Sequence, residues 1–140
     1  MLCPACDKVE MFVLEFELIE LDWCPQCRGV WLDSGELDLV GRRAGVLQDG
    51  LLKALEEGGG RKSGDGKRPC PICRKTLRQV QTDTAPPIVV DRCPRGHGLW
   101  FDSGELQAVV AAAGAEEDNV LARFFGELKG AGGQQEGDER

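Results

Sequence analysis

The sequence has no tyrosine, a single histidine, and no apolar run as long as the roughly 18 residues that a membrane-spanning helix requires. No apolar signal segment follows Met1, and the number of cysteines, seven, is odd. These absences argue against a secreted protein that disulfides hold together and against a membrane protein, so we expect a cytoplasmic protein. The sequence also has no excess of cationic residues: its formal net charge is −7, which disfavours non-specific binding to nucleic acid.

What the sequence does contain is an internal repeat. Residues 24–37 (CPQCRGVWLDSGEL) recur at residues 93–106 (CPRGHGLWFDSGEL), with nine of fourteen positions identical at an offset of 69. A second short motif precedes each copy, CPAC at residues 3–6 and CPIC at residues 70–73. Two modules of about 45 residues therefore follow one another, and units that small rarely bury enough apolar surface to fold without a metal or a cross-link.

The cysteines and the histidine all fall inside four short segments of these motifs, residues 3–6, 24–27, 70–73 and 93–97, which we call knuckles. Two C-x-x-C pairs about 15 to 20 residues apart are typical of a zinc site, because each pair supplies two thiolates from one tight turn and a hairpin brings the pairs together. In the second set Gly96 stands where Cys27 would align, and the imidazole of His97, one residue later, is long enough to reach the metal. The predicted ligands of two zinc ions are Cys3, Cys6, Cys24 and Cys27 for the first, and Cys70, Cys73, Cys93 and His97 for the second.

Other interpretations of the same residues stay open at this point. His97 could be an exposed loop residue, which would leave three thiolates and a water in the second site, and an open coordination position would permit catalysis. Iron, as in rubredoxin-like electron carriers, also uses paired knuckles, although the sequence has few aromatic residues to shield a redox centre. A thioredoxin-like role of the CPAC motif is disfavoured, because four knuckles in two matched pairs are better explained as metal ligands.

Local patterns predict the elements around these sites. The segment between the first two knuckles is rich in β-branched and aromatic residues with partial alternation, which predicts a β-hairpin, with an amphipathic helix as the alternative. A helical apolar stripe runs from Leu37 to a predicted end near Glu57, and its glycines allow either a kink or two shorter helices. In the second module residues 76–81 and 88–92 are predicted strands, and two helical segments follow, the second of them over 120–128.

Acidic residues shared by the two copies have the spacing of a helix start. Asp33 is followed three residues later by Glu36, and Asp102 by Glu105, as in an N-terminal capping arrangement, with Ser34 as an alternative cap. These paired carboxylates are therefore predicted to be caps rather than catalytic groups.

Glycines and tryptophans are also shared by the two copies. We expect Gly29 and Gly98 to take the left-handed conformation that lets backbone N–H groups point at sulfur. Trp31 and Trp100 are expected to pack beside the metal and anchor the helix, with stacking on nucleic-acid bases as the alternative.

The pattern C-P-x-C followed by C-P-x-C-x-G-x-W-L-D-x-G-E-L resembles the TFIIB-type zinc-ribbon family, also described as transcription-factor zinc-finger domains. The resemblance covers about residues 1–42 and 69–110 and extends beyond the knuckle spacing to the WLDSGEL tail of the first copy. It implies a zinc-bound ribbon followed by a helix, in two tandem copies. It transfers the first ligand set directly and the second set with the one-residue shift to His97.

The predicted fold is a small metal-stabilised α+β protein with two tandem zinc ribbons, each a short β-hairpin followed by an α-helix. We expect the first ribbon and helix over residues 1–57 and the second ribbon and helices over 70–129. The Gly-rich, basic residues 58–69 are predicted to be a flexible linker, and residues 130–140 a disordered tail.

Three functional hypotheses follow. The leading hypothesis is a non-enzymatic zinc-binding interaction module with a protein partner, because both sites close with four ligands and the sequence shows no nucleophile, base or phosphate loop. The second hypothesis is a transcription-related protein that binds DNA or RNA through basic residues of the second ribbon, namely Arg74, Lys75, Arg78, Arg92 and Arg95. The third hypothesis is a metalloenzyme or a rubredoxin-like redox protein.

Overall fold

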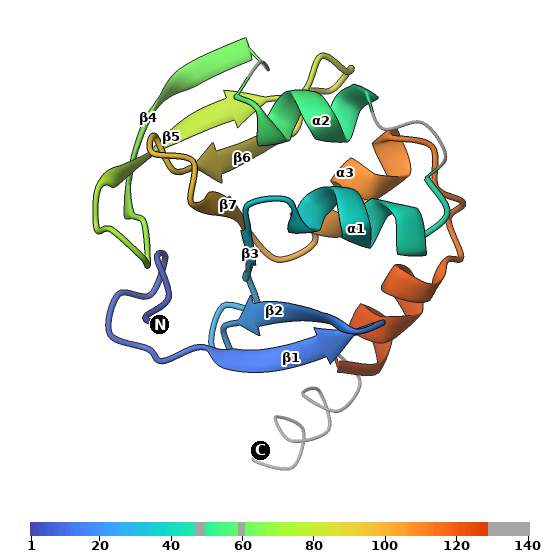
Figure 1. Cartoon of the computed structure of the whole chain (residues 1–140), viewed down its shortest axis with the longest axis horizontal. Helices are drawn as coiled ribbons and strands as arrows, with labels where there is room; N and C mark the ends of the chain where they lie inside the picture. Colours follow the sequence, from blue (N-terminus) through green and yellow to red (C-terminus); the bar gives the residue numbers. More distant parts are fainter. Residues whose placement is uncertain (47–49, 59–60, 129–140) are drawn as a thin grey trace.

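A computed structural model describes residues 1–46, 50–58 and 61–128. Within these residues the two repeats share one antiparallel sheet with the strand order β1-β2-β3-β7-β6-β5-β4 (Figure 1). The first repeat contributes β1 to β3, the second repeat contributes β5 to β7, and β4 comes from the segment between the repeats. The strands are β1 (Phe12–Phe16), β2 (Ile19–Trp23), β3 (Val30–Asp33), β4 (Arg61–Pro69), β5 (Thr76–Gln81), β6 (Val89–Arg92) and β7 (Gly98–Phe101).

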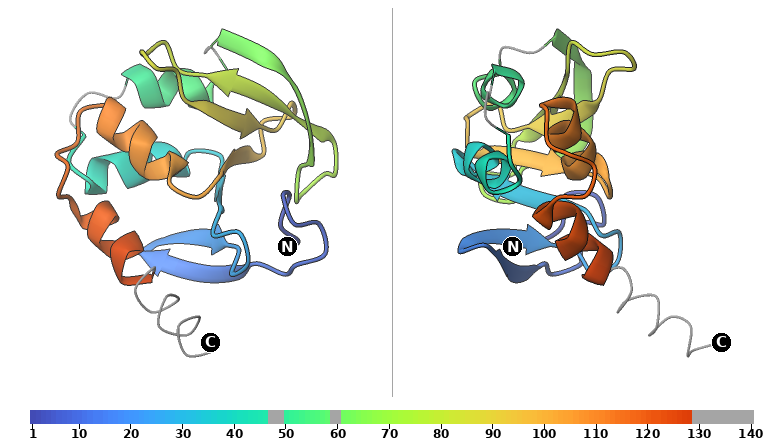
Figure 2. Two further views of the ribbon diagram at one scale, coloured as in Figure 1. Left: turned by 180° about the vertical axis from the view of Figure 1, so that it is seen from behind. Right: turned by 90° about the vertical axis from the view of Figure 1, so that its right-hand side faces the viewer.

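The helices lie together on one side of this sheet, to the right in Figure 1, whereas the N-terminal knuckle lies on the opposite side (Figures 1 and 2). They are α1 (Glu36–Arg43), α2 (Gly50–Glu56) and α3 (Glu105–Ala112), and residues 120–128 form a further helical segment. In the part of the chain that the structure describes, none of the helices has both the length and the apolar character to span a membrane.

The β1–β2 hairpin turns through two residues without glycine. Phe16 pairs with Ile19, so that Glu17 and Leu18 form the loop, and both have left-handed backbone angles, with φ of 50° and 70°. Two left-handed central residues are the geometry of the type I′ turn that matches the twist of a hairpin. The predicted hairpin is therefore confirmed, and its turn is formed by Glu17 and Leu18 in place of the usual Asn-Gly pair.

The two repeats join through β3 and β7. Trp31 lies opposite Trp100, with Val30 opposite Phe101 and Leu32 opposite Leu99. The offset between the repeats is 69, so Trp31 pairs with its own counterpart, Trp100. Val30 pairs with the counterpart of Leu32, and Leu32 pairs with the counterpart of Val30. The joint is thus an internal version of the self-complementary contact that a two-fold symmetric dimer forms.

Successive side chains of β3 and β7 point to opposite faces of the sheet, and each face belongs to a different core. Val30, Leu32, Leu99 and Phe101 face the helices and belong to the larger core, which also contains the buried faces of α1, α2 and α3. Trp31 and Trp100 face the other way. They form a second core, mostly sulfur and aromatic, with Cys3, Met11, Cys24, Cys70, Leu77 and Cys93.

The segment predicted to be a flexible linker is a strand over most of its length. From Arg61 to Pro69 it forms β4, which pairs antiparallel with β5 despite two register shifts. Composition alone indicates a tether, but the free edge of β5 offers backbone hydrogen bonds that fix the chain. The flexible-linker prediction is therefore wrong for these residues. The predicted tail at 130–140 lies outside the described residues.

The first helical stripe divides as the glycines allow, into α1 and α2, with Gly45 left-handed just after the first helix. The start of α1 differs from the predicted cap. Gly35, with φ of 89°, is the N-cap residue, and no side chain of the predicted capping residues bonds to the helix N-terminus. The backbone N–H of Asp33 does donate to the Glu36 carboxylate at 2.9 Å, so one half of the expected capping arrangement is present.

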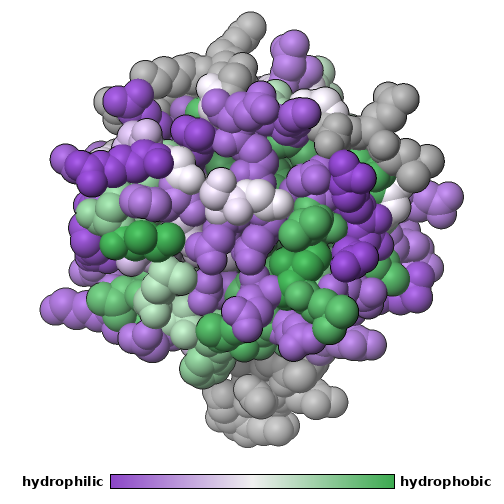
Figure 3. All heavy atoms as spheres, viewed as in Figure 1, coloured by the Kyte–Doolittle hydropathy of each residue, from purple (hydrophilic) through white to green (hydrophobic). Residues whose placement is uncertain are grey.

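The surface in the view of Figure 1 is mainly hydrophilic, with apolar residues in patches that hydrophilic residues separate (Figure 3). The large apolar side chains that are exposed come from different elements. They include Phe12 and Val13 on β1, Leu18 in the first turn, Leu39 on α1 and Ile72 in the third knuckle.

Candidate metal centres

The first cluster contains the four predicted ligands of the first repeat. The ligand atoms of Cys3, Cys6, Cys24 and Cys27 all lie within 4.8 Å of one another. The Sγ atoms of Cys3 and Cys27 are 3.7 Å apart, and those of Cys6 and Cys24 are 3.9 Å apart. These separations are far longer than a disulfide bond of about 2.05 Å, and all four cysteines are free thiols.

The second cluster contains the four predicted ligands of the second repeat, including the displaced histidine. The donor atoms of Cys70, Cys73, Cys93 and His97 also lie within 4.8 Å of one another. The Sγ atom of Cys93 is 3.7 Å from that of Cys73 and 3.4 Å from Nδ1 of His97. The imidazole therefore faces the sulfurs with Nδ1, and His97 is not an exposed loop residue turned away from the site.

Both clusters have the dimensions of a tetrahedral zinc site. Zinc–sulfur bonds of about 2.3 Å place two sulfurs of a tetrahedron about 3.8 Å apart, and a zinc–nitrogen bond of about 2.0 Å gives a sulfur–nitrogen edge of about 3.5 Å. The measured edges of 3.7, 3.9 and 3.4 Å agree with these values. The residues present thus fit two zinc ions, one to each repeat.

Backbone N–H groups of the knuckles point at the buried sulfurs. The N–H groups of Cys6 and Cys27 donate to the Sγ atoms of Cys3 and Cys24 at 3.3 and 3.4 Å. In the second repeat the N–H groups of Ile72 and Arg95 donate to Cys70 and Cys93, both at 3.3 Å. Such bonds stabilise a thiolate, which is the form of cysteine that binds a metal.

The left-handed residues that shape the knuckles differ from those predicted. Gly29 and Gly98 do not have a left-handed backbone. In three knuckles the residue after the second cysteine has this conformation instead, with φ between 65° and 70°; these residues are Asp7, Arg28 and Arg74. In the fourth knuckle the left-handed residue is Gly96, one position earlier, with φ of 78°. This earlier turn explains why the fourth ligand follows one residue late, as a histidine.

Burial and hydrogen bonding shift the pKa values of the cluster thiols in opposite directions. Burial raises the pKa of Cys27 and of Cys70 to about 11 in each case, against the backbone hydrogen bonds that lower it. For Cys73, the hydrogen bond from the backbone of Lys75 lowers the pKa to about 7, and His97 adds to this effect. Burial opposes the thiolate form, and the positive charge of a divalent metal stabilises that form when the metal binds.

Gly29 and Gly98 have a different role, which is to make room for the tryptophan of the opposite repeat. A Cβ atom on Gly29 would lie 2.2 Å from the Trp100 ring, and one on Gly98 would lie 2.6 Å from the Trp31 ring. Each ring therefore packs on the glycine of the other repeat. Both repeats contain the pattern G-x-W, but only the pairing of β3 with β7 shows that the glycine of one repeat makes room for the tryptophan of the other.

Both tryptophans are fully buried, as predicted from their place beside the metal. They lie in the same core as a buried cysteine pair of each cluster, so they connect the two metal sites. Their indole N–H groups donate to the carboxylates of Asp33 and Asp102 at 2.9 and 3.1 Å. With no exposed ring face, they are not available to stack on nucleic-acid bases.

The basic residues considered for nucleic-acid binding are only partly available. Arg74, Lys75, Arg78 and Arg95 are exposed. The guanidinium of Arg92 instead donates to the backbone carbonyl oxygens of Glu56 and Cys93, at 3.1 and 3.4 Å. Arg92 therefore connects the end of α2 to the second ribbon, and its prediction as a phosphate contact is not supported.

Comparison with known proteins gives one result for this architecture. The family described as transcription factor zinc-finger, a TFIIB-type zinc ribbon, matches residues 2–43 and 69–112, which together make up more than half of the chain. Neither a curated protein nor a solved structure matches the chain. The two matched stretches coincide with the two repeats, and each contains one complete metal cluster.

Proposed function

The chain belongs to the TFIIB-type zinc-ribbon family, and we propose that it is a non-enzymatic zinc protein whose paired ribbons bind another protein. In this proposal Cys3, Cys6, Cys24 and Cys27 bind one zinc ion, and Cys70, Cys73, Cys93 and His97 bind the other. The zinc ions would be structural and hold the knuckles closed. We further propose that the protein acts in the cytoplasm, where a reducing environment keeps its free cysteines available to zinc.

The observation that supports a structural role is the completeness of both clusters. Each brings four donor atoms together within 4.8 Å, which is the full complement of a structural zinc site. A catalytic zinc ion usually has three protein ligands and keeps one position for water or substrate. With four donors around each ion, no such position is left for a substrate.

A protein partner is favoured over nucleic acid by the distribution of charge and of buried groups. The chain has a formal net charge of −7, Trp31 and Trp100 are buried, and Arg92 bonds within the fold. Ribbons of this kind can contact either class of macromolecule, so fold alone does not decide the partner. The acidic balance opposes the phosphate contacts that provide most of the affinity for nucleic acids.

A capture experiment with the full-length, zinc-loaded chain tests this proposal. Extract from the native cell is divided, and one half is treated with nuclease before capture on the immobilised chain. We expect the same proteins to be retained from both halves, and retention to fall when zinc is removed by a chelator. Retention that disappears with nuclease, or that is unchanged without zinc, would contradict the proposal.

A second candidate function, binding of DNA or RNA, has one observation in its favour. Arg74, Lys75, Arg78 and Arg95 are exposed basic residues of the second ribbon. If they contact phosphates, binding in a gel-shift assay should weaken steeply with salt, by roughly one unit in the slope of log affinity against log salt for each contact. Replacing Arg74 and Lys75 by glutamate should reduce that slope. No salt-dependent shift of DNA or RNA would reject this candidate.

A further inference from the structure

Strand β1 forms one end of the sheet, so its outer side has no neighbouring strand within the described residues (Figure 1). Phe16 pairs with Ile19 across the two-residue turn, and hydrogen-bonded pairs then recur at every second residue of β1. The N–H and C=O groups of Val13 and Glu15 therefore point away from β2. In the part of the chain that the structure describes, no backbone group bonds to them.

The chain itself uses the adjacent part of this edge. The backbone N–H of Met11 donates to the carbonyl oxygen of Met1 at 2.9 Å, and Leu2 lies antiparallel to Glu10. The N-terminal ammonium group also forms an ion pair with the Glu10 carboxylate at 2.8 Å. These contacts show which interactions suit the edge, namely a backbone in antiparallel pairing and a cation beside an acidic side chain.

One face of the β1–β2 hairpin is acidic. Glu15 lies directly opposite Glu20, and both side chains are exposed. Like charges in such a cross-strand pair repel each other, and neither carboxylate has an ion-pair partner among the described residues. Residues 9–23 contain five acidic residues and no lysine or arginine. A basic side chain on a strand added to β1 would lie beside Glu15 and offset this repulsion.

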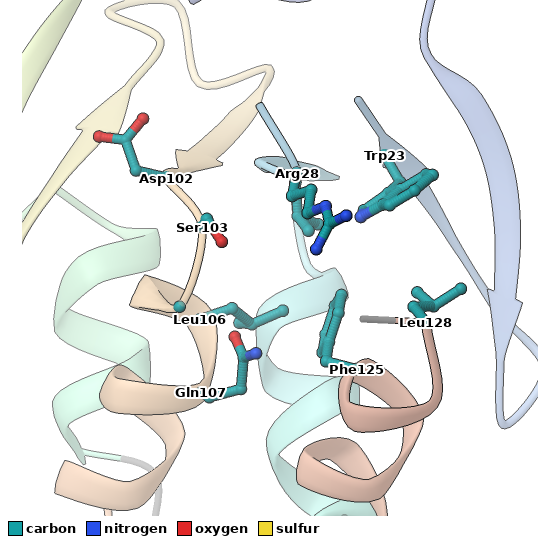
Figure 4. Close-up of a pocket in the computed structure, with 10 residues that line it drawn as sticks. Trp23, Arg28, Asp102, Ser103, Leu106, Gln107, Phe125 and Leu128 are labelled. Atoms are coloured by element: carbon teal, nitrogen blue, oxygen red, sulfur yellow. The ribbon is translucent and has the colours of Figure 1, made fainter. Parts of the chain in front are cut away.

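The opposite face of the hairpin is apolar and only partly covered. Phe16 is buried against Phe124, with the ring centroids 5.2 Å apart. At the other end of β1, Phe12 is 54% exposed, and its ring centroid lies 6.4 Å from that of Trp23. Trp23 in turn lines a hollow of about 160 Å³ near the start of α3, together with Phe125 (Figure 4). The apolar face therefore continues from the larger core to the edge, where apolar side chains of an added strand can pack beside Phe12.

We propose that the outer edge of β1 binds an extended segment of a partner protein in which basic and apolar residues alternate. The segment adds to the sheet antiparallel to β1 and bonds to the backbone of Val13 and Glu15. Because successive side chains of a strand point to opposite faces, its basic residues lie on the acidic face and its apolar residues on the face of Phe12. The inference rests on the proposed function, since it names the surface by which a protein partner is recognised. A second copy of β1 fits less well, because it is itself acidic.

The probe for this proposal is the peptide KVKVKVK with both ends blocked, titrated into the full-length, zinc-loaded protein and followed by amide NMR. We expect saturable binding with a dissociation constant on the order of 0.1–1 mM, because few backbone bonds form. Hydrogen exchange of the Val13 and Glu15 amides should slow on binding, whereas the Leu14 and Phe16 amides, which already bond to β2, should change little. No saturable binding, or binding without protection of Val13 and Glu15, would overturn the proposal.

Control peptides separate backbone pairing from simple attraction between charges. The peptide KKVVVKK has the same composition without the alternation, so it should bind at least about fivefold more weakly. N-methylation of the two inner lysines of KVKVKVK removes N–H groups that face β1, and it should abolish the protection. N-methylation of two of the valines, whose N–H groups face away from β1, should leave binding nearly unchanged. Equal binding of the two methylated peptides, or of KVKVKVK and KKVVVKK, would contradict the proposal.

A pair of charge reversals tests the acidic face. Glu15→Lys removes the repulsion from Glu20, so the fold should be retained, while KVKVKVK should bind about fivefold more weakly. Asp83→Lys changes the net charge by the same amount in the exposed loop between β5 and β6, and it should leave the affinity unchanged. Equal weakening by both variants would show a response to overall charge alone and would overturn the proposal.

Sedimentation of the protein without peptide tests whether a second copy takes the same edge. We expect a monomer. A dimer that KVKVKVK dissociates would assign the edge to a second copy and overturn the assignment to a basic segment. These outcomes are separate from the capture experiment: retention of proteins from extract without any peptide response would disprove this site and leave the proposed function standing.

Discussion

At the scale of single residues, the glycine and the tryptophan of each repeat form the contact that unites the molecule. Trp100 packs on Gly29, Trp31 packs on Gly98, and both rings lie between the two metal clusters. The arrangement has no space for even a methyl group at either glycine. It explains, in physical terms, why both copies have glycine two residues before tryptophan.

We therefore predict that Gly29→Ala lowers the free energy of unfolding by about 2–3 kcal/mol, because the new methyl group would overlap the Trp100 ring. Urea unfolding at saturating zinc measures this loss. Gly126→Ala is the matched control: its Cβ would meet nothing within 4 Å, and alanine is the better helix former. Equal stability of Gly29→Ala and wild type would contradict the packing described here.

His97 is the residue that most distinguishes the two metal clusters. His97→Ala should lower the zinc affinity of the second site by about 100-fold, since each of four ligands contributes on the order of a quarter of the binding free energy. Competition with a chelator of known affinity measures the change, and Arg95→Ala provides an exposed neighbour as control. Unchanged affinity in His97→Ala would show that the fourth ligand has been assigned wrongly.

At the scale of elements, the first hairpin stores local strain in its turn. Leu18 is 83% exposed and has a φ of 70°, a conformation that costs a residue with a Cβ atom about 1 kcal/mol. Leu18→Gly should therefore stabilise the protein by about 1 kcal/mol, measured as a rise in the urea midpoint. Leu18→Ala removes the same exposed side chain but keeps the Cβ atom, so it should bring no such gain. If both variants behave alike, the turn is not of the left-handed type.

The first turn of α3 contains a titratable group with a pH-dependent effect. Burial, together with the negative charges of Asp102 and Asp91, raises the pKa of Glu105 from its ordinary 4.5 to about 7, against the hydrogen bond from the Asp102 N–H and the charge of Arg68. Between these values the folded state keeps a proton that the unfolded state has lost. The contribution of this group to stability therefore decreases as pH rises from about 4.5 to about 7.

Glu105→Gln removes this ionisation while its amide oxygen can still accept the hydrogen bond from Asp102. At saturating zinc we expect the variant to be more stable than wild type by about 1 kcal/mol at pH 8, a figure that allows for solvent screening of a partly exposed group. The advantage should shrink at pH 6. Glu116→Gln, at an exposed position, should show no such trend. An advantage that is constant with pH would refute the linkage.

At the scale of the whole molecule, the sequence predicted which residues cluster and most of the elements but not how the repeats join. Knuckle spacing indicated all eight residues that the structure brings together in two clusters, and periodicity located β5 and the helices. The β3–β7 joint escaped prediction because four residues such as VWLD have little local preference, and their pairing depends on a match with a segment 69 residues away. Strand β4 escaped for a similar reason, since its polar, Gly-rich sequence becomes a strand only beside β5.

The joined sheet also changes the description of the molecule. Two ribbons on a flexible tether would move independently, whereas a continuous sheet with a shared helical core fixes them relative to each other. The hollow at the start of α3 is lined by residues of both repeats, and this arrangement is possible only in the joined form. Loss of zinc from either repeat should therefore disturb both halves of the molecule.

X-ray absorption at the zinc edge, combined with native mass spectrometry of the full-length chain, tests the central claim most directly. We predict two zinc ions per chain, surrounded by seven sulfurs at about 2.3 Å and one imidazole nitrogen at about 2.0 Å, without an oxygen ligand. A single bound ion, another metal, or an oxygen atom in the coordination shell of either ion would contradict it.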